Sequence, residues 1–503
     1  MRKTQLFGLA VMMLLILTLV LSGCGNKAAA GGGGSDGLDT SKQVELSLYV
    51  IGVEPPKQAE LYENFNKIAL EKVNATLKVN WIGWAEYPTK YPVLFSSGEA
   101  FDMSYAATWL NFAALAQRGA FLELDEMWPK YAPQNYARQS RTAIGQAAVN
   151  GRLYAIPTLQ ATYSAYGPVY RADLATPYGW DGKMDNFEDL EKFMEIVHAN
   201  NPGIEPYQVY QSGSEADDSF IYQDGMFAIK GSTNDFFFFD PRESNPKLFT
   251  WWEYGRVNEF LTMMKRWNDK GFIYKSGLSD ADSEKFRNGK SAIYFHNIDT
   301  YESQYRDHPQ WDVRWNNFVS DVSNMSFTQD ALVFPTTAKN PERALALYEL
   351  ITNDEQVFRA FFYGVEGKSY ELVNEGGQYQ IRGINADYYG FSNLWAARTN
   401  EFVLPVVGAP PDLKQRKAAY DAYIKDGVKS QKYRSLVIDT TSVETEYSAC
   451  ISVHQQYWWP LELGYVDMAS GLRDYQDKMT AAGIEKVRAA LQNQLDDYVA
   501  NFK

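Results

Sequence analysis

Aromatic residues are the feature of this sequence that points most directly to chemistry. The chain contains 13 Trp, 34 Tyr and 28 Phe, which together make up 15% of its 503 residues. Many of them belong in cores. However, the flat faces of Tyr and Trp also cover the C–H faces of pyranose rings, while their polar edges form hydrogen bonds. The composition therefore favours a carbohydrate-binding cleft.

Signals for covalent catalysis or for a metal site are weak by comparison. Neither a His-Glu-x-x-His pattern nor a P-loop occurs. The four histidines, His198, His296, His308 and His454, do not have ligand spacing on one helix or strand, so we expect no metal and no cofactor. Acidic residues are plentiful, which leaves a glycoside hydrolase that uses two carboxylates as an alternative.

The net charge of the chain limits the classes of molecule that it can bind. Lys and Arg total 48 against 62 Asp and Glu, a formal net charge of −14. An acidic chain without a basic run argues against binding to nucleic acid or to an anionic membrane surface.

Cys24 and Cys450 are the two cysteines. If Cys24 is modified as described next, Cys450 lacks a disulfide partner and is expected to be a small buried hydrophobe.

The first 24 residues combine the parts of an export signal. Two basic residues precede a nearly unbroken apolar run from Leu6 to Leu21, which is too short to span a bilayer as a helix. The run ends in LSGC at 21–24, which resembles the lipobox of bacterial lipoproteins. The resemblance implies cleavage before Cys24 and a lipid on its sulfur. An ordinary signal peptide or an anchor helix is the alternative.

The elements that would position a binding site follow in β-α-β-α-β order. Period-two alternation and apolar runs predict strands at 44–50, 76–81 and 101–105, with helices near 56–69 and 87–97. This order implies a parallel sheet with right-handed crossovers, whose ligands bind at the carboxyl ends of the strands. Trp84, Thr108 and Trp109 are therefore placed at a ligand site. The 460 or so residues of the body are too many for one core.

Six segments resemble, in order, motifs of the family-1 extracellular solute-binding proteins of ABC importers. They are SGEAFDM (97–103), GAFLELD (119–125), NGRLYAIP (150–157), YRADL with NFEDL (170–174, 186–190), FRNGKSAI (286–293) and NPERA (340–344). A further segment, YGVEGKSYE at 363–371, resembles a motif of the long LipO-like branch, which carries an extra C-terminal domain. The matches cover most of the body and thin out after residue 405.

The resemblance implies an α/β fold of the periplasmic-binding-protein type II, with two lobes that each hold a mostly parallel sheet flanked by helices. We expect chain crossings between the lobes near 155–159, 295–297 and 334–337. The expected parts are a signal peptide (1–23), a lipidated flexible tether (24–42), a first lobe (43–155 plus about 297–336), a second lobe (156–296 plus about 337–400) and a largely helical C-terminal extension packed on the second lobe (401–503).

Residues at the strand ends, beyond the crossings and in the 363–371 motif make up the predicted cleft. We expect aromatic stacking from Trp84, Trp109, Tyr163, Trp251 and Tyr363. We expect hydrogen bonds to sugar hydroxyls from Glu86, Thr108, Gln160, Asn297, Asp330 and Glu366.

Several of these residues have simpler explanations. Trp251 and Trp252 should point one ring inward and one outward, because neighbouring side chains on an extended chain face opposite sides. Glu366 is as well suited to stabilising its own lobe as to binding a ligand. His296 fits an interior histidine, and Asp217 with Asp218 fits a solvated surface.

The function that the resemblance implies is non-enzymatic. A monomeric lipoprotein, held at the extracellular face of the cell membrane through Cys24, would capture an oligosaccharide or modified sugar and deliver it to the permease subunits of an ABC importer. The alternatives are a secreted glycan-active enzyme and a surface lipoprotein that binds polysaccharide or peptide.

Overall fold

The computed structural model describes residues 37–84, 86–210, 215–229, 235–280, 282, 284–319, 321–388, 394–399, 401–425, 432–433 and 436–501. The chain divides into two units, Met1–Leu38 and Asp39–Lys503, and the following concerns the second. The predicted signal peptide, Cys24 and most of the predicted tether lie outside the described residues. Within the described part of the chain, no helix has the length and apolar character needed to cross a membrane.

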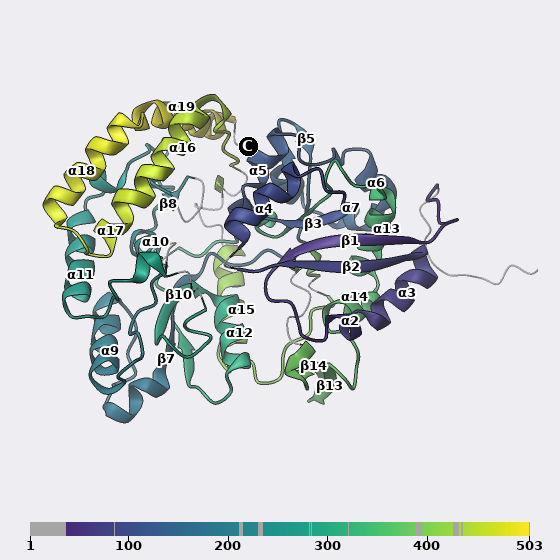
Figure 1. Ribbon diagram of the computed structural model, residues 1–503, viewed down its shortest axis with the longest axis horizontal. Coiled ribbons are helices and arrows are strands. Elements are labelled where there is room, and N and C mark those ends of the chain that lie inside the picture. The colour runs from purple at the N-terminus through teal and green to yellow at the C-terminus, as the bar shows by residue number, and fades with distance from the viewer. Residues whose placement is uncertain are drawn as a thin grey trace, which may run out of the picture. The chain divides into compact units, whose positions relative to one another are not determined.

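A five-stranded sheet forms the centre of the first lobe (Figure 1). Its strands, in spatial order, are β2 (Ala75–Ile82), β1 (Val44–Ile51), β3 (Met103–Ala106), β12 (Ala331–Val333) and β6 (Ile156–Pro157). β1 pairs in parallel with β2 and β3, as predicted, whereas β12 runs antiparallel to β3 and β6. The predicted alternation of β1 is confirmed, since Leu46, Leu48 and Val50 are fully buried.

Helices cover this sheet and come from two distant parts of the chain. α13 contacts α3, α6 and α7, and α14 contacts α3. Glu349 of α13 accepts hydrogen bonds from the backbone N–H groups of Gln134 (2.8 Å) and Asn135 (3.0 Å), in the first turn of α7. The helices are α3 (Glu63–Val73), α4 (Tyr87–Ser96), α5 (Phe112–Gln117), α6 (Met127–Tyr131), α7 (Pro133–Arg138), α8 (Arg141–Gln146), α13 (Pro341–Asn353) and α14 (Glu355–Phe362).

The second lobe holds a smaller, antiparallel sheet of β10 (Ile293–Asn297), β7 (Tyr166–Arg171) and β11 (Val313–Trp315), in that order. The prediction that each lobe has a mostly parallel sheet is wrong for this lobe. Gly167 of β7 is required at its position, because a Cβ there would lie 2.0 Å from the carbonyl oxygen of Asn316.

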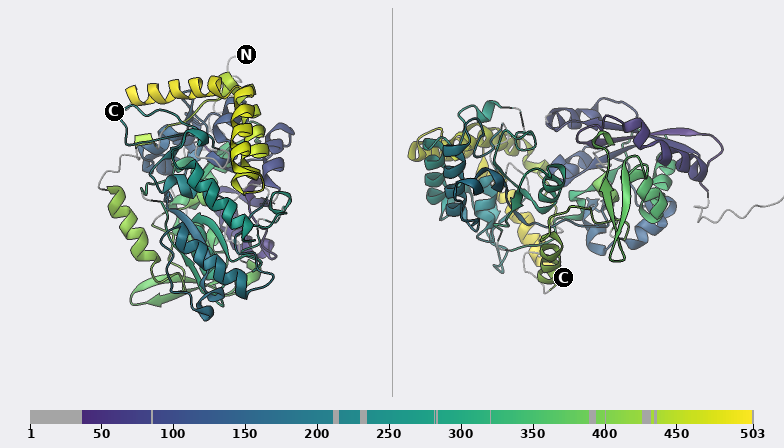
Figure 2. Two further views of the ribbon diagram at one scale, coloured as in Figure 1. Left: turned by 90° about the vertical axis from the view of Figure 1, so that its left-hand side faces the viewer. Right: turned by 90° about the horizontal axis from the view of Figure 1, so that it is seen from below.

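Helices of the second lobe share one hydrophobic core with the C-terminal helices. The former are α9 (Phe187–Asn200), α10 (Ala216–Tyr222) and α11 (Val257–Asp269), and the latter are α16 (Glu444–Val453), α17 (Trp459–Glu462), α18 (Met468–Ala481) and α19 (Ile484–Asn501), which lie together in the left view of Figure 2. Two further helices, α12 (Ile298–Asp307) and α15 (Leu413–Lys425), pack in a separate hydrophobic cluster with β7 and β11. Asn186 caps α9 by accepting from the N–H groups of Glu188 (2.9 Å) and Asp189 (3.0 Å). Cys450 is buried, as predicted.

Two of the three predicted crossings between the lobes are wrong. The chain leaves the first sheet after β6 and enters β7, close to the predicted position, but it then stays in the second lobe through β11. It returns at 316–330 and, after β12, remains with the first lobe through the hairpin β13 (Tyr370–Glu375)–β14 (Gln378–Gly383). The last crossing, at 408–412, leads into α15, where Lys417 pairs with Glu302 of α12 (2.9 Å).

These crossings correct the predicted lobe boundaries. Part of the 297–336 segment, including β11, belongs to the second lobe, and the described residues of the 337–400 segment pack on the first lobe instead of the second. The physical reason is that alternation identifies a strand but not its sheet. Hydrogen-bonding partners from distant parts of the chain decide that choice.

Candidate functional site

A cleft of about 2090 Å³ is bounded by residues of both lobes. From the first lobe it receives residues that follow β2 and β3, and from the second it receives β10, the start of α12 and the segment before β7. Its position at the carboxyl ends of β2 and β3 is the one that the β-α-β-α-β order predicts. The cleft is thus formed by the connections that precede or follow strands. The backbone hydrogen bonds of these strands fix the positions of the connections.

Stacked indoles form the first-lobe face of the cleft, which we call the aromatic wall: Trp84, Tyr87, Trp109 and Trp395. The ring of Trp84 lies 6.3 Å from Trp109 and 6.0 Å from Trp395, each at an interplanar angle of 26°. Tyr87 meets Trp109 edge to face at 5.4 Å. All four side chains are only partly buried, so ring surface remains open to a ligand.

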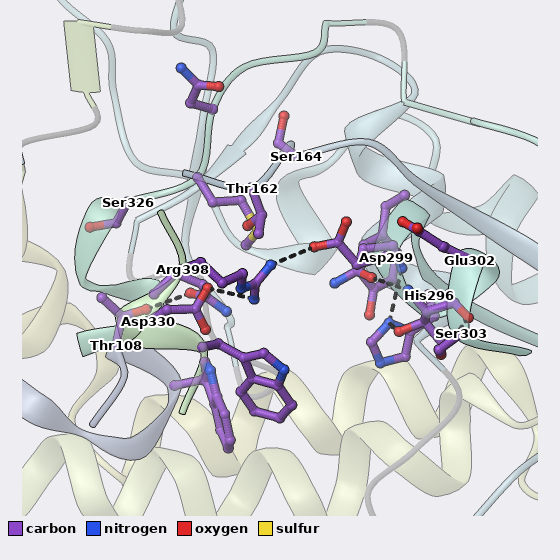
Figure 3. A pocket seen from close by; sticks show the side chains of 18 of the residues that line it. Thr108, Thr162, Ser164, His296, Asp299, Glu302, Ser303, Ser326, Asp330 and Arg398 are labelled. Atoms are coloured by element: carbon purple, nitrogen blue, oxygen red, sulfur yellow. Dashed lines mark hydrogen bonds and ion pairs between the residues drawn. The ribbon is translucent and has the colours of Figure 1, made fainter. Parts of the chain in front are cut away.

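Arg398 lies at the floor of the cleft and joins the two lobes (Figure 3). Its guanidinium contacts Asp330 before β12 (3.1 Å) and Asp299 of α12 (3.2 Å). Tyr105 donates a hydrogen bond to the other oxygen of Asp330 (2.7 Å). Burial raises the pKa of Asp330. Burial opposes ionisation of Asp299 too, but Lys417 and Arg398 outweigh it and lower the pKa of Asp299.

The second-lobe face, which we call the tyrosine–carboxylate wall, comprises Tyr166, Tyr210, Glu215, Asp218 and Tyr222. Glu215 accepts hydrogen bonds from the hydroxyls of Tyr166 (2.6 Å) and Tyr210 (3.3 Å). Burial, followed by the negative charge of Glu215, raises the pKa values of both tyrosines well above their usual value. Glu215 has a φ of 58°, a left-handed conformation that is uncommon outside Gly, Asn and Asp and is associated with functional sites.

Asp217 and Asp218 do not form the solvated surface that the sequence suggested. Both are partly buried, and Asp217 accepts a hydrogen bond from the indole of Trp458 (3.0 Å). Burial raises the pKa of each carboxyl, and for Asp218 the neighbouring charges of Asp217 and Asp235 raise it further. Burial at the start of α10 was not visible in the sequence, because two adjacent acids normally indicate exposure.

The C-terminal helices reach the cleft and contact the first lobe. The Oγ1 of Thr441 donates to the side-chain oxygen of Gln117 (3.0 Å), and Glu444 pairs with Arg118 just after α5. The cleft-lining residues of this region are mostly apolar: Tyr433, Leu436, Val437, Ile438, Thr440, Tyr447 and Ile451. The extension therefore contributes to the cleft and does not only support the second lobe.

Seven of the predicted ligand residues line the cleft: Trp84, Thr108, Trp109, Gln160, Asn297, Asp330 and Tyr363. Not all of them offer free groups. The Asn297 side chain caps α12 by accepting from Thr300 N–H (2.9 Å), and the Tyr363 hydroxyl accepts from Leu404 N–H (3.1 Å). Gln160 is different, because its buried Oε1 has no hydrogen-bond partner among the residues that the structure describes.

Trp251 and Tyr163 are placed away from the cleft. Trp251 is fully buried and stacks on Trp458 at 4.6 Å, while Trp252 is partly exposed, so the inward and outward pair occurs, but neither ring lines the cleft. Tyr163 packs on Tyr420, because its neighbours Thr162 and Ser164 take the cleft-facing positions of an extended segment.

Glu86 and Glu366 are not cleft residues either. Glu86 is exposed and pairs with Lys90 one turn along α4 (2.7 Å). Glu366 is exposed in the turn before β13. Their carboxylates point to solvent, so neither supports the predicted contact with a sugar hydroxyl.

Sequence reasoning missed several cleft residues. Tyr87 and Tyr105 could have been found, since each is adjacent to a predicted strand end or helix start. Trp395 and Arg398 could not have been found, because the sequence predicts that the segment that carries them belongs to the second lobe. His296 lines the cleft and stacks on Tyr166 (5.7 Å), with Nδ1 2.7 Å from the hydroxyl of Thr300, so it is not an interior residue. Among the described residues, no group of three His, Cys, Asp or Glu could hold a metal ion.

Comparison with known proteins shows what class of protein this is. Residues 54–358 match the model of the family described as "Bacterial extracellular solute-binding protein", and residues 433–500 match "Domain of unknown function (DUF3502)". A "Carbohydrate ABC transporter substrate-binding protein" of Streptococcus pneumoniae serotype 4 is 24% identical over 513 residues, which cover 100% of both chains.

Solved structures share the architecture. The N-glycan transport solute-binding protein NgtS of Streptococcus pneumoniae, in complex with Man1GlcNAc, has a TM-score of 0.76 at 21% identity and covers 91% of this chain and 100% of its own. Its complex with Man5GlcNAc gives 0.75 at 23% identity, covering 92% and 100%. The alginate-binding protein AlgQ2 gives 0.59 at 16% identity, covering 90% and 98%.

The fold is therefore the two-lobed, type II solute-binding architecture, which confirms the predicted fold class. The chain belongs to the bacterial extracellular solute-binding protein family. Members of this family are binding proteins and not enzymes, which agrees with the expectation that the chain catalyses no reaction.

Proposed function

We propose that this protein is the substrate-binding component of a carbohydrate ABC importer and that it captures an oligosaccharide or modified sugar in the cleft. The observation that carries the proposal is the aromatic wall facing the tyrosine–carboxylate wall. Stacked indole faces suit the C–H faces of sugar rings, and the opposite face supplies hydroxyls and carboxylates for sugar hydroxyls. The curated pneumococcal relative, described as a carbohydrate ABC transporter protein, supports the same role.

The size of the cleft supports an oligosaccharide over a single sugar. Pockets for ordinary small ligands measure about 300–1,000 Å³, whereas this cleft measures about 2090 Å³. The related NgtS structures are described with Man1GlcNAc and Man5GlcNAc, which are glycans of different length. A cleft of this volume would hold several sugar rings between the two walls.

A lipid on Cys24 is the proposed means of keeping the protein at the extracellular face of the membrane. The LSGC segment at 21–24 directly follows the apolar run, and Gly25 to Lys42 is rich in small and polar residues that would serve as a tether. Delivery to permease subunits in the same membrane requires this proximity. We propose that the protein acts as a monomer, with the rims of both lobes facing the permease.

Ligand binding can be tested with the purified body, residues 39–503, and a panel of oligosaccharides. We expect at least one sugar to raise the melting temperature and to give saturable heats in calorimetry, and chromatography should recover it uncut. Cleavage products would overturn the proposal in favour of a glycan-active enzyme. Stabilisation by peptides alone would overturn the carbohydrate assignment.

Anchoring can be tested separately in cells fed a radiolabelled fatty acid. We expect label on the wild-type chain and none on Cys24→Ser. The matched control is Cys450→Ala, which removes the other cysteine of the chain and should leave the label in place. Label on Cys24→Ser would overturn the anchoring proposal and leave the sugar-binding proposal untouched.

A further inference from the structure

The charges that line the cleft discriminate between classes of glycan. We propose that the ligand is an uncharged oligosaccharide and that the cleft rejects uronates, sulfated sugars and other anionic glycans. This inference rests on the proposed carbohydrate-binding function and specifies its substrate class.

Carboxylates outnumber cations in the cleft. Its described lining contains ten Asp and Glu side chains against five Lys and Arg side chains. Four of the cations already contact carboxylates of the lining: Arg287 with Glu284 (3.2 Å), Arg306 with Asp307 (2.8 Å), Arg398 with Asp299 and Asp330 (3.2 and 3.1 Å), and Lys417 with Glu302 (2.9 Å). The fifth, Lys414, is an exposed side chain of α15.

The remaining carboxylates have no cation within ion-pair distance in the described part of the chain: Glu215, Asp218, Asp321, Glu375 and Asp421. Asp218 contributes the least negative charge, because burial and neighbouring carboxylates raise its pKa. Neutral groups donate to the other four instead. Tyrosine hydroxyls donate to Glu215, to Asp321 (Tyr423, 2.8 Å) and to Asp421 (Tyr163, 2.7 Å), and the Gln380 amide donates to Glu375 (3.2 Å). A neutral donor satisfies a carboxylate oxygen but leaves its negative charge in place, so the cleft keeps a negative potential.

Neutral and anionic sugars meet this potential differently. Each hydroxyl of a neutral sugar can donate to a carboxylate, and such charge-assisted hydrogen bonds are strong. A uronate or sulfate group is only an acceptor, so it cannot form such bonds with the carboxylates of the lining and gains a matching charge only from a guanidinium or ammonium group. Arg398 is the cation at the floor of the cleft, and its positive charge is already matched by Asp299 and Asp330. An anionic ligand would therefore lose its own solvation and meet like charges, and the exposed Lys414 would offer it only a weak, solvent-screened ion pair.

The test uses matched pairs of neutral and acidic oligosaccharides of equal length and linkage. β-1,4-Mannotetraose with β-1,4-tetramannuronate and unsulfated with sulfated galactan fragments are suitable pairs, measured by thermal shift and calorimetry at low salt. We expect each sugar that binds to be the neutral member of its pair. Its acidic partner should bind about 100-fold more weakly or not at all, and added salt should reduce the difference by screening the repulsion.

Variants separate charge from shape. Glu215→Gln removes one negative charge from the tyrosine–carboxylate wall and should reduce the neutral-to-acidic affinity ratio about tenfold. Glu71→Gln on the exposed surface of α3 makes the same charge change outside the cleft and should leave the ratio unchanged.

The outcomes distinguish the two proposals. An acidic sugar that binds as tightly as its neutral partner would overturn this inference while leaving carbohydrate binding intact. A difference that neither salt nor Glu215→Gln reduces would also overturn it, because shape would then cause the selectivity. No response to any sugar would overturn the proposed function itself and this inference with it.

Discussion

The two faces of the cleft use aromatic residues in opposite ways. On the aromatic wall, Trp84 presents a ring face in a stack with Trp109 and Trp395. On the tyrosine–carboxylate wall, Tyr166 and Tyr210 use their hydroxyls to hold Glu215. The first arrangement supplies non-directional contact area and the second supplies direction. A high aromatic content therefore indicates a binding cleft without indicating which rings stack and which act through their polar edges.

The two walls of the cleft also differ in how they affect the stability of the folded protein. The stacked indoles bury apolar surface and stabilise the first lobe as they form the site. The other wall keeps Glu215 in a left-handed backbone conformation and holds Asp217 and Asp218 where burial raises the pKa of each carboxyl. Such an arrangement persists only when surrounding structure enforces it. We therefore expect the second lobe to be the less stable of the two and the more sensitive to pH.

Arg398→Ala should have the largest effect, because it removes the cation that joins the two walls at the floor. Asp330 would remain buried without its ion pair, and breaking such a pair costs about 3 kcal/mol of unfolding free energy. Urea unfolding followed by tryptophan fluorescence measures the loss. The double variant Arg398→Ala with Asp330→Asn should recover at least half of it, and a single variant as stable as wild type would show that the ion pair contributes nothing.

Trp84→Ala should weaken binding of the oligosaccharide found in the panel about 100-fold, because this ring contacts both other indoles of the stack. Truncating a central aromatic residue of an interface commonly costs about 2–4 kcal/mol. Trp84→Phe keeps a ring face and should stay within about tenfold of wild type. Calorimetry measures both values. An alanine variant within threefold of wild type would assign the binding energy to the opposite wall.

His454→Gln should reduce the acid sensitivity of the second lobe. Burial lowers the pKa of His454 to about 3, and its Nδ1 lies 2.8 Å from the hydroxyl of Tyr475. In the unfolded chain histidine titrates near 6.5. Between pH 6.5 and 3 the unfolded state therefore binds more protons, so stability contributed by neutral His454 is lost as the pH falls through this window.

The measurement for His454 compares urea unfolding at pH 8 and pH 4.5. The wild type should lose about 2.7 kcal/mol more than His454→Gln over this interval, because the glutamine does not titrate. Equal losses in the two proteins would mean that His454 does not govern the acid response. The aromatic wall serves as the comparison for this acid response. Its side chains, Trp84, Tyr87, Trp109 and Trp395, do not titrate between pH 4.5 and pH 8.

Tyr166→Phe should have the smallest effect, about fivefold weaker binding, because it removes one hydroxyl and keeps the ring. A single hydrogen bond contributes about 1 kcal/mol net. Tyr379→Phe removes a hydroxyl from a side chain that is 51% exposed on the β13–β14 hairpin and should bind like wild type. If Tyr166→Phe weakened binding more than Trp84→Ala, the division of roles between the walls would be reversed.

Local elements of this protein were predictable because their signals are local. Alternation predicted β1, and the helix expected near 87–97 is α4. The same reasoning placed Trp84, Thr108 and Trp109 at the ends of β2 and β3, where they line the cleft. These residues are within a few positions of the element that holds them, so no distant contact was needed to place them.

The residues that the sequence placed wrongly, or did not place in the cleft, share a cause that is not local. Trp251 and Tyr163 have the right chemistry for a ligand, but Trp458 and Tyr420 cover them, and both partners come from the C-terminal part of the chain. Arg398 was not considered because the segment that carries it was assigned to the wrong lobe. In each case the deciding contact joins residues that are more than 60 positions apart.

The amino-acid sequence alone identified the first strands and helices, the motifs of the family and the aromatic and acidic composition suited to a sugar-binding cleft, and it predicts an export signal. The tertiary structure alone decided which sheet each late strand joined, which tryptophans kept an open face and which carboxylates met a cation. The physical reason is that periodicity and capping depend on near neighbours along the chain. Burial and ion pairing depend instead on which distant segments the fold brings together.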